Sequence, residues 1–394
     1  MTTNIRHILV CSDQYPIKED PVFPFVEQLV NAFSKMGIHI SVVAPQSLTK
    51  VILRGKPLHP RYRKIQKKDN GLIEVYQPYV LSFGNKFPKL NRFFAKASLC
   101  FALSKIKSKP QICYGHFWHC AIALYSYAKR NNIPLFVSSG EADVALETNV
   151  AKEKIRSFLN YYSGVFFVSS KNKKECEKLG YLSSQKNIVV PNSIDPLLFY
   201  KKDRIALRKK YSIPLDSFIV VFVGGFIERK GPDRVADALR KIGNNNIKAF
   251  FIGHELDDVK CDINYDGILL KSVIEHDCLA TYLNMADVFV LPTLAEGCCN
   301  AIVEAMACGL PIISSNLPFN DDILDDSCSI RVNPRSVEEI VSAILTLHDN
   351  IDLRKKMEQA SLKKAVNLSI DKRAEKILNF IETSVSCGEE LVKD

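Results

Sequence analysis

Short apolar segments alternate with segments of helical spacing along this chain, and the alternation occurs in two separate series. In the first series, an apolar run at 7–13 (HILVCSD) is followed by a helix-like segment at 24–37 and by a second apolar run at 39–45 (HISVVAP). A strand, a helix and a further strand in this order predict a parallel sheet. Further apolar runs of this series lie at 111–118, 134–140 and 164–170.

The second series begins at SFIVVFVGGF (217–226) and repeats the same pattern. Its next apolar runs are IKAFFIG (247–253) and DVFVLPT (287–293), with helix-like segments between them. We therefore predict an α/β chain of two domains, the first at 1–198 and the second at 199–370. Two parallel-sheet domains of this kind leave a cleft at the carboxyl ends of their strands, where ligands bind.

The composition limits the class of protein. The length of 394 residues suits two domains, and 47% hydrophobic and 24% charged residues are typical of a soluble globular chain. No apolar run approaches the roughly 18 residues of a membrane span, and the segment MTTNIRHILVCSDQYP lacks the features of a signal peptide. We therefore expect a cytoplasmic protein. The 12 cysteines show no C-x-x-C pair and no zinc spacing, so we expect reduced thiols and no metal site.

The stretch LAEGCCNAIVEAMACGLPII (294–313) carries two carboxylates, Glu296 and Glu304, among small and apolar residues. The pattern predicts a loop that contains Glu296, followed by a helix with Asn300 as N-cap and Glu304 in its first turns. The free amides of a helix N-terminus favour phosphate, and an ionised carboxylate accepts hydrogen bonds from paired sugar hydroxyls. The alternative is a solvated loop glutamate and a helix glutamate paired with a nearby cation.

Three stretches together resemble one enzyme family. They are Glu296 and Glu304 with seven residues between them, VGGFIERKG (223–231) and VVPNSIDPLLF (189–199). The chain resembles the retaining family-4 glycosyltransferases (glycosyl transferases group 1), whose GT-B fold has two Rossmann-like parallel-sheet domains facing across a cleft. The resemblance implies an N-terminal acceptor-binding domain and a C-terminal domain for a nucleotide-sugar donor. It also implies that a final helix at about 371–394 completes the first domain.

The resemblance implies a role for each matching residue. Glu304 is expected to hold the ribose of the donor, and Glu296 is expected to contact the donor sugar. Lys230 matches the phosphate-binding lysine, whose charge would stabilise the leaving diphosphate. The expected donor-binding positions are Gly225, Gly297, Cys298, Cys299, Asn300 and Glu304.

This sequence departs from the family pattern at two places near the donor. An arginine that often follows the first glycine of the second stretch is replaced by Gly225, and Arg229 is a candidate to compensate for it. A solvated turn cation is the alternative reading of Arg229. A Phe-Gly pair is replaced by Cys298 and Cys299, whose small side chains preserve room for a close backbone approach. A reactive or metal-binding thiol pair is the competing interpretation.

The N-terminal half departs further from the family. The segment SDQYPIKEDPVFP (12–24) contains no glycine, where relatives often have a glycine-rich loop. Where relatives commonly place a histidine, this chain has Gly140 and Glu141. We name Glu141 and His116 as acceptor-side candidates, with a structural role as the alternative for each.

The net charge of +10 is concentrated in the first half, notably at 61–70 and 85–110. No nucleic-acid-binding motif accompanies these cations, so nucleic acid is not an expected partner. In the segment 85–110, apolar residues at helical spacing alternate with Lys89, Arg92 and Lys96. Such a helix either packs on its own sheet or docks on an anionic membrane surface.

We therefore predict a hexosyltransferase-type enzyme that moves a sugar from a nucleotide sugar to a glycan or lipid-linked acceptor, with retention of anomeric configuration. We also expect a role in polysaccharide biosynthesis, a peripheral position on the inner face of the membrane, and no cofactor or metal. Two alternatives stay open. One is a nucleotide-sugar 2-epimerase of the same fold class, and the other is a catalytically silent nucleotide-binding subunit that supports a partner enzyme. The sequence leaves the sugar, the base, the acceptor and the oligomeric state undetermined.

Overall fold

The computed structural model describes most of the chain and divides into two compact units. The described residues are 3–20, 23–67, 71–83, 87–144, 152–182, 185–255 and 261–390. Unit 1 holds residues 1–168, 172–190 and the C-terminal segment from Arg373, and unit 2 holds 169–171 and 191–372. The main break falls between Val190 and Pro191, and the second break falls between Lys372 and Arg373.

Unit 1 is built on an eight-stranded sheet with the order β10-β9-β8-β7-β1-β2-β5-β4. All neighbours are parallel except β4 and β5, and β3 pairs with β6 in a separate two-stranded sheet. The strands are β1 (His7–Cys11), β2 (His39–Val43), β3 (Gln46–Ser47), β4 (Tyr62–Gln66), β5 (Leu72–Tyr76), β6 (Tyr79–Val80), β7 (Ile112–His116), β8 (Leu135–Ser139), β9 (Gly164–Phe167) and β10 (Lys186–Val189). Strands β1, β7, β8 and β9 are buried along their whole length, as expected for a parallel sheet covered on both faces.

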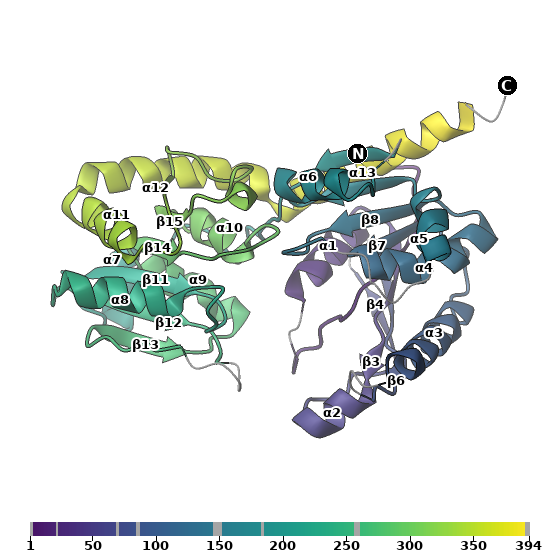
Figure 1. The fold of residues 1–394 in the computed structure, drawn as a ribbon, viewed down its shortest axis with the longest axis horizontal. Coiled ribbons are helices and arrows are strands. Elements are labelled where there is room, and N and C mark those ends of the chain that lie inside the picture. The colour runs from purple at the N-terminus through teal and green to yellow at the C-terminus, as the bar shows by residue number, and fades with distance from the viewer. Residues whose placement is uncertain are drawn as a thin grey trace. The chain divides into compact units, whose positions relative to one another are not determined.

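The helices of unit 1 are grouped around this sheet, except that α2 lies apart from it at one end of the unit (Figure 1). They are α1 (Pro24–Lys35), α2 (Leu48–Arg54), α3 (Pro88–Ser104), α4 (Trp118–Asn131), α5 (Lys152–Leu159), α6 (Ser170–Lys178) and α13 (Ile370–Glu390). On the α4 side, the ring of Trp118 lies 6.3 Å from that of Phe158 and 5.7 Å from that of Tyr162, centroid to centroid. Aromatic side chains of this size supply much of the apolar area that a core buries.

The segment 46–81 carries elements for which the strand–helix alternation gave no prediction. Strand β4 is an antiparallel edge strand whose residues alternate between exposed and half-buried, so its apolar signal is weak. Helices α2 and α3 lie with β3 and β6 at one end of unit 1 in Figure 1. This end of the unit exposes large apolar side chains, including Ile52 (76% exposed), Leu53 (79%) and Phe93 (66%).

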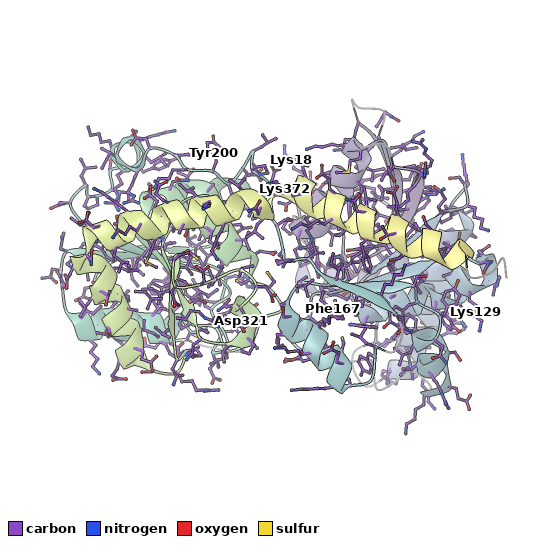
Figure 2. All side chains as sticks on the ribbon, turned by 90° about the horizontal axis from the view of Figure 1, so that it is seen from above. Lys18, Lys129, Phe167, Tyr200, Asp321 and Lys372 are labelled. Carbon is purple, nitrogen blue, oxygen red and sulfur yellow. The ribbon has the colours of Figure 1, made fainter. Side chains whose placement is uncertain are left out.

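Helix α13 belongs to unit 1 from Arg373 onward. Figure 2 shows it crossing this unit, and Phe380 contacts the rings of Phe166 and Phe136 at 5.1 and 6.3 Å between centroids. Glu382 accepts hydrogen bonds from the Thr3 hydroxyl and from the backbone N–H of Asn4. These contacts attach the C-terminal helix to the N-terminal sheet.

Unit 2 has a six-stranded, fully parallel sheet with the order β13-β12-β11-β14-β15-β16. In chain order within the unit this is 3-2-1-4-5-6, the arrangement of Rossmann-type domains. The strands are β11 (Phe218–Val223), β12 (Ile247–Ile252), β13 (Ile268–Ser272), β14 (Val288–Leu291), β15 (Ile312–Ser315) and β16 (Ser329–Val332). The central strands β14 and β15 are buried throughout.

The helices of unit 2 connect these strands and extend past the last one. They are α7 (Arg204–Lys210), α8 (Pro232–Ile242), α9 (His276–Met285), α10 (Asn300–Ala307), α11 (Val337–Asp349) and α12 (Ile351–Ala365), with the short 3-10 turns Pro318–Asn320 and Val366–Leu368. No helix within the described residues is both long and apolar enough to cross a membrane. Parallel Rossmann-like sheets in both units confirm the predicted α/β fold class.

Candidate active site

The sheet of unit 2 changes its winding direction between β11 and β14. The chain leaves β11 toward β12 on one side and leaves β14 toward β15 on the other. In open parallel sheets, ligands bind at the carboxyl ends of the strands beside this switch point. The two stretches that carry the predicted donor residues follow these two strands, because 223–231 continues from β11 and Glu296 lies on the loop after β14.

Three predicted residues meet at this switch point. The Oε1 atom of Glu296 accepts hydrogen bonds from Lys230 Nζ at 2.5 Å and from Arg229 Nη1 at 3.1 Å. Glu296 is 9% exposed, and the side chain of Arg229 is the most open of the three. Two cations therefore face one carboxylate, which leaves an excess positive charge beside a largely buried anion.

Neighbouring polar groups hold this carboxylate and its loop. The hydroxyl of Thr293 donates to Glu296 Oε1 at 2.8 Å, and the hydroxyl of Ser315 donates to the carbonyl of Thr293. Arg234 on α8 donates to the carbonyls of Glu228 at 3.0 Å and Pro292 at 2.9 Å. Arg234 thus ties the loop that carries Lys230 to the loop that carries Glu296.

Glycine is required at the start of α8. Gly231, directly after Lys230, has φ +74, and a Cβ atom there would come within 2.3 Å of the Arg234 guanidinium. This left-handed conformation is readily accessible only to glycine. Gly225 differs, because a Cβ there would meet only the His254 ring at 3.8 Å, an ordinary contact. The place of Gly225 in the donor site therefore stays a prediction without a steric requirement behind it.

Helix α10 begins at Asn300, with Cys299 as the N-cap, so the predicted N-cap at Asn300 is wrong by one position. The Cys299 side chain makes no capping hydrogen bond, which leaves the first-turn amides without a side-chain cap. The Oδ1 atom of Asn300 is buried and has no hydrogen-bond partner. Free amides and an unpartnered amide oxygen are groups that a polar ligand would satisfy.

The loop Gly297, Cys298 and Cys299 is buried and packs against the predicted connector. Asn192 in that connector donates its side-chain amide to the Cys298 carbonyl at 2.8 Å. Burial raises the pKa of Cys299 to about 11, which keeps the thiol neutral at physiological pH. A neutral, buried thiol is a poor nucleophile and a poor metal ligand, which favours the interpretation of Cys299 as a small space-sparing residue.

Glu304 lies on α10, is 8% exposed, and accepts a hydrogen bond from His276 Nε2 at 2.8 Å. His276 begins α9, and its ring lies 5.2 Å from that of Phe199. Burial alone would lower the pKa of His276, but its contact with the Glu304 carboxylate outweighs this and the pKa is raised. The sequence analysis missed His276, because no motif joins it to Glu304 across 28 residues.

The sheet of unit 1 has its own switch point, between β1 and β7. Asp13 follows β1 and His119 lies in the first turn of α4, and the His119 Nε2 and Asp13 Oδ1 atoms are 2.6 Å apart. The thiol of Cys120 donates to the same carboxylate oxygen at 3.7 Å. Asp13, His119 and Cys120 are near enough to share a metal ion, the one such group among the described residues. The direct Asp13–His119 hydrogen bond gives this cluster an arrangement that needs no metal.

The acceptor-side candidates His116 and Glu141 lie near this second switch point. His116 is buried between the rings of Phe25 and Phe117, and burial lowers its pKa to about 3. Glu141 accepts a hydrogen bond from the backbone N–H of Trp118 at 2.9 Å, at the start of α4. Burial raises the pKa of Glu141. These contacts supply structural roles for both residues, and their proposed part in acceptor binding stays a prediction.

A polar pocket of about 430 Å³ opens beside Asp13 within unit 1, and we call it the polar pocket. It is also lined by Asp20, His59 and Gln77. His59 Nε2 lies 3.3 Å from Asp20 Oδ2, and the side-chain amide of Gln77 is 2.9 Å from His59 Nδ1. Carboxylate, amide and imidazole groups of this kind suit a ligand with many hydroxyls.

Residues 203–364 match the family model described as "Glycosyl transferases group 1". These residues form a glycosyl transferases group 1 domain. The match contains the switch point of unit 2, with Lys230, Glu296 and Glu304. The chain is therefore a glycosyltransferase, as its motifs predicted.

Curated relatives of this glycosyltransferase extend the likeness beyond the group 1 domain. A candidate teichuronic acid biosynthesis glycosyltransferase of Bacillus subtilis, TuaC, is 25% identical over 338 residues, which are 81% of this chain and 83% of that protein. An Escherichia coli UDP-Gal:alpha-D-GlcNAc-diphosphoundecaprenol alpha-1,3-galactosyltransferase is 29% identical over 222 residues, 53% of this chain and 57% of that protein.

A solved structure confirms the GT-B fold of the glycosyltransferase. Sucrose-phosphate synthase from Thermosynechococcus elongatus matches it with a TM-score of 0.78 at 16% identity, over 97% of this chain and 100% of the other. At this identity the likeness concerns the fold alone. The group 1 domain thus carries a cationic switch point, and the other unit carries a polar switch point of different composition.

Proposed function

We propose that this glycosyltransferase moves a sugar from a nucleoside diphosphate sugar to an acceptor with retention of anomeric configuration. Unit 2 holds the donor and unit 1 holds the acceptor. The observation that carries the proposal is the convergence of Lys230 and Arg229 on Glu296 at the switch point of unit 2, next to the N-terminus of α10. The resemblance of the Glu-x7-Glu stretch to the retaining family supports the stereochemistry.

The charges of this cluster suit a reaction in which a diphosphate leaves. The donor's diphosphate competes with Glu296 for Lys230, and once Lys230 turns to it, the Glu296 carboxylate is free to accept bonds from sugar hydroxyls. Negative charge grows on the diphosphate as the glycosidic bond breaks. Lys230 and the α10 amides stabilise that charge because they are already in place when it develops.

Glu304 is proposed to hold the ribose of the donor, with His276 as its positioning partner. The 2.8 Å contact fixes one carboxylate oxygen and leaves acceptor capacity for a ribose hydroxyl. A uridine nucleotide is the first donor to test, since the Escherichia coli relative is named for UDP-Gal. The reaction is proposed to need no metal, because Lys230, Arg229 and helix amides supply the positive charge.

The acceptor is proposed to be a glycan, carried on a lipid as in the name of the Escherichia coli relative. The Asp13–His119 pair and the polar pocket offer groups that bind sugar hydroxyls. Asp13 is the group that we assign to the reacting hydroxyl of the acceptor, since an ionised carboxylate accepts a strong hydrogen bond from it. His116 and Glu141 are proposed to support this site from behind.

A lipid-linked acceptor implies that the enzyme works at a membrane surface. Helix α3 buries Leu99, Ala102 and Leu103 but leaves Phe93 66% exposed, so only part of its apolar surface packs on the sheet. The exposed Ile52 and Leu53 of α2 extend this apolar end of unit 1. We propose that this end docks on anionic lipid, with each cation near the surface adding about 1 kcal/mol.

The donor test uses the full chain and a panel of nucleotide sugars. A donor present at 100 times its Kd raises the free energy of unfolding by about 2.7 kcal/mol, which a thermal shift detects.

The product of the reaction tests the stereochemistry. Sugar transfer to a lipid-linked or soluble glycan, with the anomeric configuration of the product determined by NMR, tests retention. A parallel reaction with EDTA tests whether a metal is needed. An inverted product would overturn the stereochemistry. A nucleotide-sugar epimer as product would favour the 2-epimerase, and binding without turnover on a broad acceptor panel would favour the silent subunit.

The membrane test uses sedimentation with vesicles. The chain should bind phosphatidylglycerol vesicles at low salt and be released as salt rises, because salt screens the attraction. Replacing Lys89, Arg92 and Lys96 with Ser should weaken binding, while replacing the exposed Lys241 of α8, in the other unit, should not. If the chain ignores anionic vesicles even at low salt, helix α3 is a packing element alone.

A further inference from the structure

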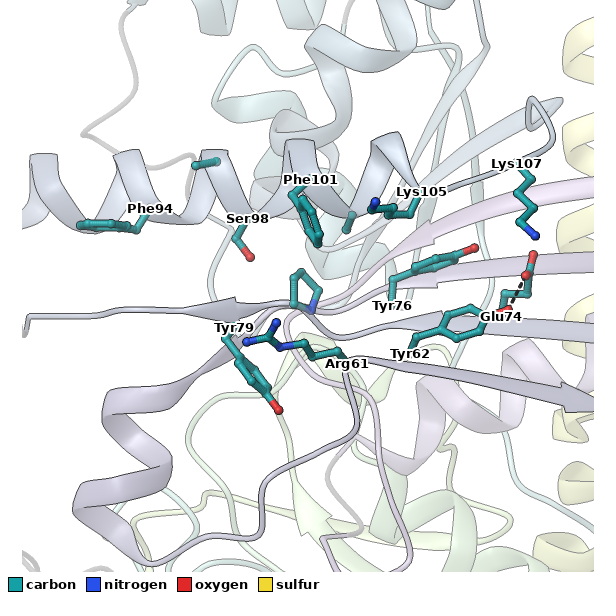
Figure 3. Close-up of a pocket in the computed structure, with 13 residues that line it drawn as sticks. Arg61, Tyr62, Glu74, Tyr76, Tyr79, Phe94, Ser98, Phe101, Lys105 and Lys107 are labelled. Carbon is teal, nitrogen blue, oxygen red and sulfur yellow. Dashed lines mark hydrogen bonds between the residues drawn. The ribbon is translucent and has the colours of Figure 1, made fainter.

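A cavity of about 690 Å³ lies within unit 1 between α3 and the segment that joins β5 to β6, and we call it the α3 pocket. Figure 3 shows Phe94 and Phe101 extending into it from α3, opposite Tyr76 and Tyr79. Aromatic and aliphatic walls of this kind bind hydrocarbon, and the volume is within the usual range of small-molecule sites. No role in the reaction proposed above requires this pocket.

One polar atom inside the pocket lacks a partner. Ser98 is 9% exposed, its hydroxyl oxygen is buried, and it makes no hydrogen bond. Figure 3 shows this hydroxyl directed from α3 into the pocket. A buried hydroxyl without a partner is uncommon, because the loss of its bonds to water is uncompensated. A ligand that enters the pocket with an oxygen atom would satisfy it.

Cations surround the pocket while its one carboxylate is already paired. The Arg61 guanidinium lies 4.2 Å from the centre of the Tyr79 ring, and the Lys105 ammonium lies 5.1 Å from that of Phe101. Within the described parts of the chain, Arg61, Lys105 and Lys107 form no ion pair. Glu74 accepts hydrogen bonds from Tyr62 at 2.7 Å and lies 2.9 Å from His39. The pocket therefore combines apolar walls with an excess of positive charge.

The α3 pocket and the polar pocket share a wall. Tyr76, Pro78 and Tyr79 line the α3 pocket, whereas Gln77, between them in sequence, lines the polar pocket. Successive side chains of an extended segment point to opposite sides, which explains why Gln77 faces away from Tyr76 and Pro78. A ligand with a hydrocarbon part and a sugar part could therefore contact both pockets around one short segment.

We propose that the α3 pocket binds the hydrocarbon chain of a lipid phosphate, with Arg61 or Lys105 at its edge pairing with the phosphate. The apolar walls accept the chain, and the cations match the anionic group at its end. Two membrane sources share this chemistry, a polyprenyl phosphate carrier and a phospholipid. The shared wall with the polar pocket favours the carrier, and this choice rests on the proposed lipid-linked acceptor.

The test fills the pocket without touching the catalytic groups. Ala97 is exposed on α3 and lines the pocket, whereas Ala95 is exposed on the same helix and does not. Ala97→Trp should weaken binding of a fluorescent polyprenyl phosphate in detergent micelles at least about tenfold, since excluding two methylene groups already corresponds to this factor. Ala95→Trp should leave binding unchanged. Exchanging Arg61 and Lys105 for Ser should also weaken it and make the remaining binding less sensitive to salt.

Other outcomes overturn the proposal. Equal binding in the Ala95 and Ala97 variants would show that the lipid does not enter the pocket, and a preference for phosphatidylglycerol over polyprenyl phosphate would reject the carrier. Activity separates this inference from the proposed function. If only the proposal that the α3 pocket binds the lipid is wrong, the Ala97→Trp variant still transfers sugar to a lipid-linked acceptor. If the proposed function is wrong, the unaltered chain transfers no sugar to any acceptor, while the lipid-binding comparison still stands.

Discussion

The switch points of the two units have the same strand topology, but the residues on their loops differ in size and charge. In unit 2, the loops after β11 and β14 carry glycine and other small residues, with Lys230 and Glu296 among them. In unit 1, the corresponding loops carry Phe23 and Phe117, both at positive φ, and the Asp13–His119 pair. Small residues let backbone amides approach a diphosphate, whereas large rings and a carboxylate exclude it. The difference supports the proposal that unit 2 holds the phosphate-bearing donor and unit 1 a hydroxyl-bearing ligand.

Removing the cation of unit 2 should have the largest effect. Lys230→Ala should lower turnover at saturating donor by about 10²–10³, the loss expected for one group that stabilises developing charge. Lys241→Ala is the matched control, since Lys241 is exposed on α8 and pairs with Glu338. The melting temperature without ligand shows whether the fold is kept. Near-normal turnover of a folded Lys230→Ala protein would place the diphosphate elsewhere.

The two glutamates of unit 2 should separate binding from turnover. Glu304→Ala should weaken donor binding about 10- to 150-fold, because a hydrogen bond to a charged group contributes roughly 1.5–3 kcal/mol. Glu296→Ala should lower turnover more than it weakens nucleotide binding. Titration calorimetry with the donor and with the free nucleotide diphosphate measures the first effect, and saturation kinetics measures the second. If both variants keep wild-type donor affinity and turnover, the assignment of the carboxylates fails.

Substitution at the switch point of unit 1 should change acceptor kinetics and not donor affinity. Asp13→Asn should slow transfer about tenfold, since it converts a charge-assisted acceptor bond into a neutral one, and should leave donor affinity unchanged. Asp266→Asn, in unit 2 and outside both sites, is a matched control for the loss of a carboxylate. A change in donor affinity instead of acceptor kinetics would contradict the division of labour between the units.

The sequence offered stronger local signals for the proposed donor site than for the proposed acceptor site, for a physical reason. Lys230 and Glu296 lie on loops that follow β11 and β14, Glu304 lies on the next helix, and all three belong to short stretches whose residue spacing is itself informative. The Asp13–His119 contact joins residues 106 positions apart, and the Glu304–His276 contact joins residues 28 apart. Neither pairing leaves a periodic or local trace, because only the strand order brings the partners together.

The fold elements were likewise predictable where their sequence signal is local, and not where it depends on distant neighbours. Fully buried parallel strands such as β1, β7 and β14 were evident as apolar runs. Strand β4, at the sheet edge, alternates exposed and half-buried residues and was read only as a basic segment. The amphipathic helix expected within 85–110 is α3. It buries Leu99, Ala102 and Leu103, whereas Phe93 and Phe101 stay exposed. Which face of an amphipathic helix is covered depends on neighbours that the local sequence does not specify.

The smallest expected effect is a difference in how the two units respond to pH. In unit 1, burial lowers the pKa of His7 to about 4 and that of His116 to about 3. At His116, Arg373 and His119 also oppose protonation, whereas Asp13 favours it. The unfolded chain binds these protons near pH 6.5, so the stability of unit 1 should fall as pH drops from 6.5 toward 4. Each proton changes the free energy of unfolding by at most about 1.4 kcal/mol per pH unit.

In unit 2 the sign is reversed, because the pKa of His276 is raised beside Glu304. Its contribution is fully present below pH 6.5 and is lost as pH rises through the higher folded value. Hydrogen exchange, corrected for intrinsic rates, should therefore show β1 and β7 opening more readily at pH 5 than at pH 7, and α9 and α10 opening more readily at pH 8 than at pH 6. His276→Gln should abolish the second trend, while His254→Gln, at an exposed position, should preserve it. Parallel pH responses in both units would mean that the His276–Glu304 contact does not favour the charged imidazole, and the positioning role of His276 at the ribose would lose its support.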